Sequence, residues 1–170
     1  MPRLTHIALA LVLAACARDA APGGAFRAPG TPIYSNAAFD FARLPGDWAQ
    51  VAAFANAGNT CSAGRAQIAP DGTLRARLCL DGSTTQVQGR ITPTGPGRFR
   101  VAGAAPGPLA QDWWIIWVDT GYRTLAIGTP SGEFGFILNR DGPLPADRLT
   151  AAAEIFDFNG YDRSRLIRLP

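Results

Sequence analysis

The chain has 170 residues, a mass of 17.9 kDa and a formal net charge of +3. This length suits one domain, or two at most, and the 47% hydrophobic content excludes an intrinsically disordered protein. All 16 basic residues are arginine, against 13 acidic residues. Such a balance argues against a nucleic-acid-binding protein, and the longest apolar run, Ile7–Ala15, is too short to span a bilayer.

The first 15 residues have the layout of a secretory signal peptide. Arg3 supplies a positive charge, Leu4–Ala15 is apolar, and the segment ends Leu13-Ala14-Ala15-Cys16. That ending resembles the bacterial lipobox, in which the cysteine is lipidated and becomes the first residue. Because Ala17 follows Cys16, the resemblance implies a lipid anchor in the outer membrane on its periplasmic face. The alternative is an ordinary signal peptide cleaved near Ala15.

Cleavage before Cys16 would leave a protein without histidine or lysine, because His6 is the only histidine and the chain has no lysine. Ser-His-Asp and Cys-His catalysis, His-ligated zinc and lysine Schiff bases would each lose their main residue. The sequence also has no phosphate-binding loop and no metal-ligand spacing. We therefore expect no catalytic residue, no cofactor and no metal site.

Cys61 and Cys79 remain as an even pair in an oxidising compartment. They flank the turn signal Pro70-Asp71-Gly72, so a hairpin would bring them close together. The interpretation is a structural disulfide, worth roughly 3 kcal/mol in the chain-entropy model. A metal site is the weaker interpretation, because two thiols are too few ligands.

The pattern along the chain is mainly β, followed by one helix. Residues 16–35 are rich in Pro and Gly and are expected to form a flexible tether. Short runs bounded by turn residues then predict a sandwich or barrel. The expected strands cover 47–55, 61–69, 73–80, 84–92, 97–103, 112–118, 123–129 and 133–139. Eight antiparallel strands can close into an up-and-down barrel whose interior holds one small ligand.

A helix is expected from about Asp147 to Phe158, packed outside the barrel. Asp147 suits the first turn of a helix, and Asn159-Gly160 is a plausible stop. One apolar stripe runs along this segment at helical spacing, made of Leu149, Ala152, Ala153 and Phe156. A last short strand is expected over 166–169.

Three short motifs occur in order within residues 36–170. Gly46-Asp47-Trp48 and Phe136–Arg140 resemble the first motif, G-x-W, and the third motif of the lipocalin family. Val118-Asp119-Thr120-Gly121-Tyr122 resembles the T-D-Y turn between the sixth and seventh strands, with Val in place of Thr. The resemblance implies an eight-stranded calycin barrel in which Arg140 covers Trp48 and plugs one end, since a guanidinium stacks well on an indole ring.

The spacing of Cys61 and Cys79 and the sequence Asn159-Gly160-Tyr161-Asp162 resemble the bacterial, apolipoprotein-D-like branch of this family. That likeness implies a lipoprotein that carries hydrophobic molecules such as fatty acids or lysophospholipids at the outer membrane.

The candidate ligand site depends on Trp113–Val118, six consecutive apolar residues that include three tryptophans. A strand wetted on one face would alternate with polar residues, so this strand is expected to bury both faces. Period 2 places Trp113, Ile115 and Trp117 on one face and Trp114, Ile116 and Val118 on the other. Lipocalin register implies that the first set points inward and the second lies under the helix. The other residues expected inside are Leu125, Ile127, Phe134, Phe136 and Leu138.

These eight inward candidates carry no charge, which suits an apolar guest at about 0.8 kcal/mol per buried CH₂. Gly97–Leu109, which overlaps the fifth strand, is expected to be a mobile loop near the open end. Arg98 or Arg100 could meet a head group there, although a solvated face is the preferred interpretation.

Two alternatives stay open, and so does a homodimer. Tryptophans could fill the barrel of a structural lipoprotein that works through a partner protein. An isomerase or de-epoxidase on a lipocalin-like barrel would need a titratable group inside.

Overall fold

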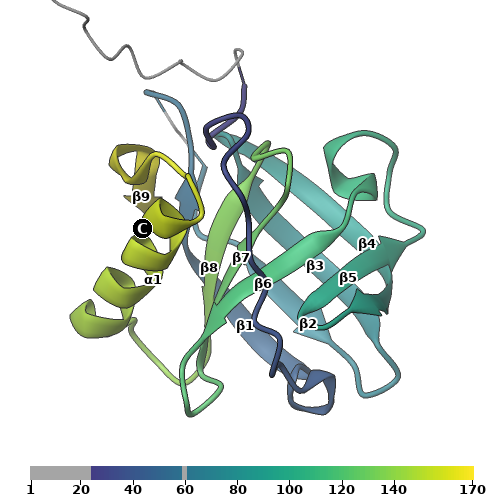
Figure 1. Cartoon of the computed structure of the whole chain (residues 1–170). Helices are drawn as coiled ribbons and strands as arrows, with labels where there is room; N and C mark the ends of the chain where they lie inside the picture. The colour runs from purple at the N-terminus through teal and green to yellow at the C-terminus, as the bar shows by residue number, and fades with distance from the viewer. Residues whose placement is uncertain (1–23, 59–60) are drawn as a thin grey trace, which may run out of the picture.

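The computed structural model describes residues 24–58 and 61–170. Those residues form a closed antiparallel barrel with α1 (Ala146–Phe158) packed against its outer wall (Figure 1). The strands are β1 (Gly46–Phe54), β2 (Arg65–Ile68), β3 (Thr73–Leu80), β4 (Ser83–Gly95), β5 (Arg98–Ala102), β6 (Trp113–Val118), β7 (Thr124–Gly128), β8 (Gly135–Asn139) and β9 (Leu166–Arg168). The expected signal peptide and the lipidation of Cys16 lie outside the described residues.

Closure follows from β1, which pairs on both of its edges. Its first residues, Gly46–Ala49, pair with β2, and its second half pairs with β8 on the opposite edge. The intervening strands follow in chain order, each antiparallel to the next. The predicted eight-stranded up-and-down barrel is confirmed. β9 adds a ninth strand beside the end of β1, where β2 no longer pairs.

Side-chain alternation explains why these segments form barrel walls. In β2 and β3 the apolar side chains of Ala66, Ile68, Leu74, Ala76 and Leu78 are buried, and the residues between them face outward. β7 and β8 are instead buried along their whole length. Two faces of burial are required there because α1 and the N-terminal segment cover the outside of these strands.

The barrel wall therefore separates two hydrophobic clusters. The inner cluster fills the barrel and includes Trp48, Trp113 and Phe136. The outer cluster lies between the wall and α1, where the rings of Phe54 and Phe156 are 4.8 Å apart. α1 has the expected bounds, and of its apolar stripe Ala152 and Phe156 are fully buried. Among the described residues, no helix has the length and apolar character needed to cross a membrane.

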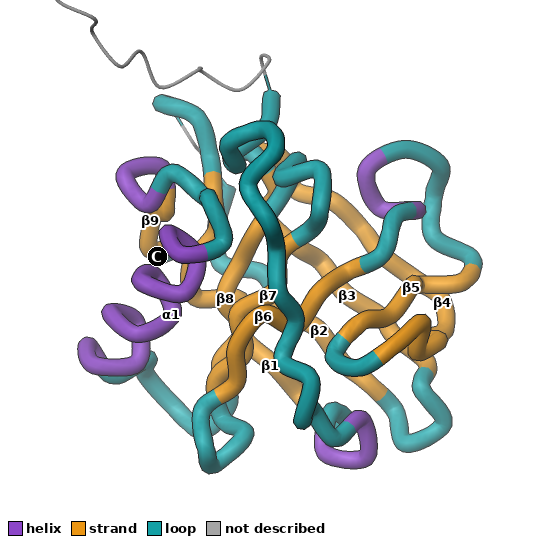
Figure 2. The backbone as a smooth tube through the Cα atoms, viewed as in Figure 1, coloured by secondary structure: helices purple, strands orange, loops and turns teal. Residues whose placement is uncertain are grey.

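Residues 24–35 are not the flexible tether that their composition predicts. Phe26 is 1% exposed, and its backbone N–H donates to the carbonyl of Gly132. The Phe26 ring packs against Phe54 and lies under the guanidinium of Arg165. Figure 2 shows this segment running across β6 and β7, where the Asn36 N–H donates to the carbonyl of Ile115. Arg27, which is 7% exposed, donates to the carbonyls of Asn159 and Pro130. Phe26 and Arg27 together anchor this Pro- and Gly-rich segment to the wall.

The disulfide between Cys61 and Cys79 is confirmed, with 5.7 Å between their Cα atoms. The expected strand over 61–69 is shorter than predicted, because β2 begins only at Arg65. Cys61 consequently lies in the β1–β2 loop, and the disulfide ties that loop to the end of β3.

Candidate functional site in the barrel interior

One end of the barrel is closed by the predicted pair of Trp48 and Arg140. The Arg140 guanidinium lies 3.6 Å from the centre of the Trp48 ring. It also donates to the carbonyls of Arg43 at 3.1 Å and Pro45 at 3.3 Å, in and just after the 3₁₀ helix Phe41–Arg43. The indole N–H of Trp48 donates to the carbonyl of Leu44 at 2.9 Å. Both residues therefore act on the fold by sealing this end.

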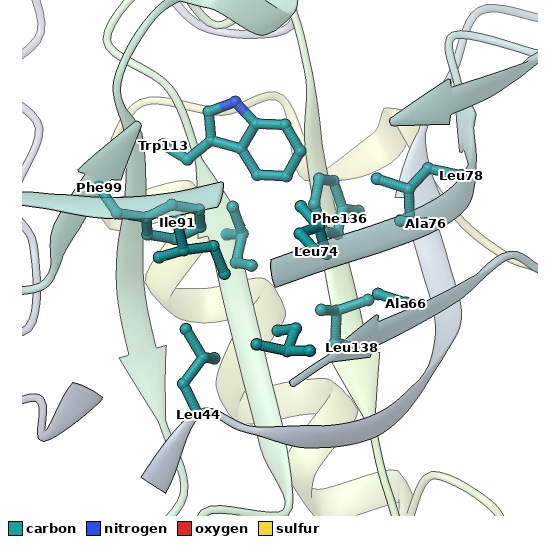
Figure 3. Close-up of a pocket in the computed structure, with 12 residues that line it drawn as sticks. Leu44, Ala66, Leu74, Ala76, Leu78, Ile91, Phe99, Trp113, Phe136 and Leu138 are labelled. Carbon is teal, nitrogen blue, oxygen red and sulfur yellow. The ribbon is translucent and has the colours of Figure 1, made fainter. Parts of the chain in front are cut away.

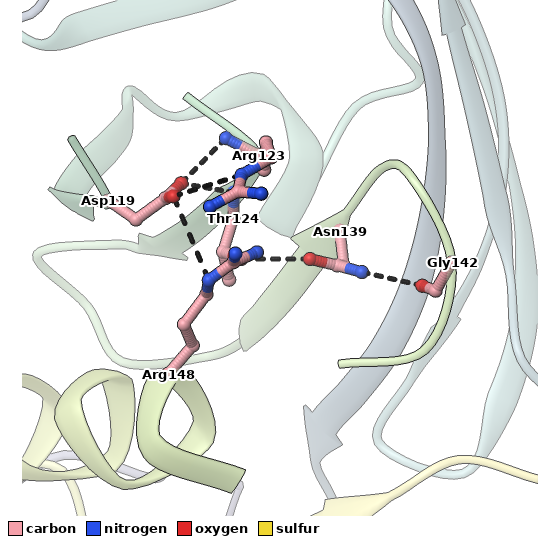
Figure 4. Close-up of polar contacts among 6 residues, drawn as sticks. All are labelled: Asp119, Arg123, Thr124, Asn139, Gly142 and Arg148. Carbon is pink, nitrogen blue, oxygen red and sulfur yellow. Dashed lines mark hydrogen bonds and ion pairs between the residues drawn. The ribbon is translucent and has the colours of Figure 1, made fainter. Parts of the chain in front are cut away.

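Asp119 organises the neighbouring turn between β6 and β7. Its carboxylate accepts the backbone N–H groups of Arg123 and Thr124, each at 2.6 Å, and lies 3.8 Å from the guanidinium of Arg148 (Figure 4). Arg148 belongs to α1, so this ion pair fixes the start of the helix against the turn. Asp119 is only 9% exposed, which places the pair in a setting where it is poorly screened by water.

Tyr122 links the same turn to the segment that leads into β1. Its hydroxyl accepts the backbone N–H of Asp40 at 3.0 Å, and the guanidinium of Arg43 lies 3.6 Å from the centre of its ring. The motif residues Asp119 and Tyr122 thus hold the closed end together.

Seven of the eight residues predicted to point inward belong to the inner cluster. They are Trp113, Ile115, Leu125, Ile127, Phe134, Phe136 and Leu138. Trp113 lies among aromatic neighbours, with ring-centre distances of 5.2 Å to Phe134, 5.7 Å to Phe136 and 5.7 Å to Phe99. Phe99, on β5, was missed by the sequence analysis, although its place between Arg98 and Arg100 in an alternating strand marks it as inward.

The prediction for Trp117 is wrong. The β6–β7 register shifts between Ile115 and Trp117, as in a β-bulge. An extra residue in a strand reverses the alternation after it. Trp117 therefore packs against the outer cluster together with Trp114 and Ile116, whereas Val118, predicted to lie under the helix, packs against the inner cluster.

The interior leaves a small cavity of about 20 Å³ (Figure 3). Every residue around it is apolar: Leu44, Ala66, Ile68, Leu74, Ala76, Leu78, Ile91, Phe99, Trp113, Ile127, Phe136 and Leu138. A volume of this size holds about one water molecule, whereas ligand pockets span roughly 300–1,000 Å³. A guest can enter only by displacing side chains that now fill the barrel.

A loop closes the opposite, open end. Residues 97–109 are not a mobile loop throughout, since Arg98–Ala102 form β5 and Leu109 is buried in the inner cluster. The indole N–H of Trp113 donates to the Leu109 carbonyl at 3.2 Å, which ties the loop to the interior. Of the two arginines considered for a head group, Arg100 is exposed, in line with the preferred solvated face, and Arg98 is half-buried. Arg98 lies 5.0 Å from the Trp114 ring, and Arg100 pairs with Asp112 at 2.9 Å.

A polar cluster connects this loop to the β7–β8 turn across the mouth. The side-chain amide nitrogen of Gln111 donates to the carboxylate of Glu133 at 2.8 Å, and the Ser131 hydroxyl donates to the side-chain oxygen Oε1 of Gln111 at 2.8 Å. These groups are exposed, so their hydrogen bonds compete with water. The loop can thus open at modest cost compared with opening the closed end.

The fold and the site can be compared with known proteins. Residues 39–170 match the family model of the lipocalin-like domain. Temperature-induced lipocalin-1 of Arabidopsis thaliana is 30% identical over 63 residues, which cover 37% of this chain and about a third (34%) of that protein.

Solved structures share the fold at lower identity. Apocrustacyanin C2 is 19% identical with a TM-score of 0.53, over 75% of this chain and 77% of that one. Lobster apocrustacyanin A1 is 16% identical with a TM-score of 0.53, over 76% and 78%. The family model matches most of the chain, and the closed eight-stranded barrel with its apolar interior agrees with that match. The chain therefore belongs to the lipocalin-like family, whose fold generally binds small hydrophobic ligands.

Proposed function

We propose that this protein is a lipid-anchored carrier of the bacterial, apolipoprotein-D-like branch, which binds fatty acids or lysophospholipids at the outer membrane. The observation that carries the proposal is the wholly apolar cavity inside a closed barrel. An acyl chain gains about 0.8 kcal/mol for each CH₂ that it buries there. In this proposal the protein binds its guest without converting it, and the apolar lining suits such a role.

Exchange of the guest follows from the small size of the cavity. The acyl chain replaces contacts that Leu109, Trp113 and Phe134 make within the inner cluster. Moving these side chains costs free energy. Because only the molecules whose barrel is open can bind, the apparent affinity is lowered in proportion to their fraction. A carrier benefits from this arrangement, because the barrel refills with its own side chains after release.

The N-terminal segment of the protein joins the barrel at its open end, which favours delivery of a lipid guest from a membrane. The first described residues pack beside the β7–β8 turn, where the backbone N–H of Phe26 donates to the carbonyl of Gly132. The same turn contacts the loop at the open end, since the Ser131 hydroxyl donates to the side chain of Gln111. Seven residues lie between Cys16 and Gly24, so the eight Cα-to-Cα steps from one to the other reach at most about 28 Å. A lipid on Cys16 would therefore keep the mouth close to the bilayer and raise the effective concentration of lipid guests.

A second candidate function is supported by the same cavity. A volume of about 20 Å³ is also what a permanently filled barrel would show. In that case the protein is a structural lipoprotein that acts through a partner protein.

Titration with a fluorescent fatty acid, together with native mass spectrometry, distinguishes the two functions. The chain is prepared with Cys16→Ser so that no attached lipid competes. Ala66→Phe fills the cavity and should weaken binding about tenfold, since overpacking a core costs about 1–3 kcal/mol. Gln67→Phe, the neighbouring outward residue on β2, is the matched control and should bind as the wild type does.

One-to-one binding that is sensitive to Ala66→Phe alone supports the carrier. Absence of binding by the wild type, or equal losses in two folded variants, would favour the filled barrel.

A further inference from the structure

We propose that the outer face of β2 and β3 is an electrostatic docking surface for anionic phospholipid. This surface, the arginine face, consists of Arg65, Arg75 and Arg77. It lies on the opposite side of the barrel wall from the ligand cavity and makes no use of it. The arginine face would set the orientation of the barrel on a membrane, which is separate from the ligand that the barrel binds.

Strand register brings the three arginines together. Arg65 on β2 is the direct cross-strand partner of Arg77 on β3, and Arg75 lies two residues before Arg77 on the same face. Directly opposite side chains in a sheet have Cβ atoms about 4.5–5.5 Å apart. All three side chains are exposed, and glutamines border them: Gln67 is opposite Arg75, and Gln86 is opposite Arg77 on β4.

The arginine face has no compensating acid. The ion pairs among the described residues within 4.0 Å involve Arg90, Arg100, Arg123 and Arg148, and none of the three arginines. The nearest outward acid on β1, Asp47, instead accepts a hydrogen bond from Gln67 at 3.0 Å. Like charges directly opposite each other destabilise a sheet. The fold therefore gains nothing from Arg65 facing Arg77, whereas an anionic partner would.

The acidic residues of α1 lie away from the arginine face. The exposed acids Asp147, Glu154 and Asp157 belong to the helix, which covers a different part of the wall from β2 and β3 (Figure 1). Exposed Arg163 and Arg168 lie beside α1 and offset part of that negative charge. The arginine face therefore offers a planar anionic surface basic side chains that no acid of α1 neutralises.

Contacts around the rim place the arginine face near the point where the chain enters. Arg165 donates to the carbonyl of Ala25 at 2.9 Å and to the side chain of Asn56 at 2.6 Å. Asn56 in turn donates to Asp81 at 2.8 Å, at the end of β3 and four residues beyond Arg77. A chain anchored at Cys16, as in the proposed function, would hold this rim near the lipid head groups. A bilayer surface that carries anionic phospholipid is therefore the occupant that fits.

Vesicle co-sedimentation of the chain beginning at residue 17 tests the proposal without the anchor. Both hydrophobic clusters are built from described residues after residue 24, so this chain keeps the fold. It should bind phosphatidylcholine vesicles only when one third of the lipid is phosphatidylglycerol, and lose that binding in about 0.5 M NaCl, where charges are screened. Each basic residue near an anionic surface contributes about fivefold, so Arg65→Gln with Arg77→Gln should weaken binding about 25-fold.

Two controls separate the arginine face from net charge and from folding. Arg163→Gln with Arg168→Gln removes the same charge from exposed arginines outside β2 and β3 and should weaken binding less than about threefold. Arg77→Glu places opposite charges across the two strands, so it should melt at or above the wild-type temperature while losing vesicle binding.

Equal losses in the two double variants, or no preference for anionic vesicles, would overturn the proposal. Fatty-acid affinity should be unchanged in Arg77→Glu, so a failure of this proposal is distinct from a failure of the carrier function.

Discussion

Trp113 and Trp117 lie on one strand, and different effects on stability and on ligand affinity are expected when each is replaced by alanine. Trp113 is 2% exposed and contacts three aromatic rings inside the barrel. Removal of a buried aromatic side chain costs about 3–5 kcal/mol, and Trp113→Ala also leaves the Leu109 carbonyl without its indole donor. Trp117 is half-buried against the outer cluster, so Trp117→Ala should cost about 1–3 kcal/mol.

Ligand binding should separate the two variants more clearly than stability does. Trp113→Ala enlarges the cavity that a guest must otherwise open, so a fatty acid should bind about tenfold more tightly, equivalent to about 1.4 kcal/mol of displacement cost removed. Trp117→Ala leaves the interior intact and should not change affinity. Urea unfolding gives the free energies, and fluorescent fatty-acid titration gives the affinities.

A result with Trp117→Ala altering affinity and Trp113→Ala leaving it unchanged would refute the placement of the two rings. Trp113→Leu leaves less empty volume, and it keeps the comparison available if Trp113→Ala is too unstable to titrate.

Three further predictions concern stability. Cys61→Ser with Cys79→Ser should lower the free energy of unfolding by about 3 kcal/mol in urea, and an unchanged midpoint would show that the loop is held by other contacts. Arg140→Gln removes the stacking on Trp48 and the hydrogen bonds to three backbone carbonyls, so a loss of about 1–3 kcal/mol is expected; no loss would mean that the closed end seals without it. Burial raises the pKa of Tyr161 to about 12. An unfolded tyrosine loses its proton near pH 10, so the folded state binds the extra proton and the free energy of unfolding should fall by about 2–3 kcal/mol between pH 10 and 12. Tyr161→Phe should remove that fall, and a fall that persists would assign it to other groups.

The closed end was predictable from sequence because its interactions depend on local motifs. Gly46-Asp47-Trp48 begins β1 and Arg140 follows β8 directly, and the resemblance of both segments to lipocalin motifs implied the contact that the structure shows. The helix stripe ending at Phe156 was predictable for the same reason, because helical spacing is a property of one segment.

The misplacement of Trp117 has a different cause. A bulge depends on how β6 pairs with β7, and six apolar residues in a row carry no polar marker of the change in register. The same strand in strict alternation would have given an identical sequence pattern.

The volume of the cavity inside the barrel could not be predicted from the sequence either. Lining residues such as Phe99 and Ile91 can be assigned to the inside by alternation, yet whether their side chains leave about 20 Å³ or a large pocket depends on packing across the barrel. Phe26 illustrates the same difficulty outside, since one aromatic residue in a flexible-looking stretch packs with 1% exposure.

The central claim, that an apolar guest enters the barrel, is tested most directly by methyl NMR during a fatty-acid titration. Ile115 and Ile127 belong to the inner cluster, while Ile116 and Ile137 belong to the outer one. Shifts of the Ile115 and Ile127 methyl signals that saturate at one equivalent, with Ile116 and Ile137 unmoved, are the predicted result. Shifts confined to Ile116 and Ile137, or none at any of the four, would contradict it.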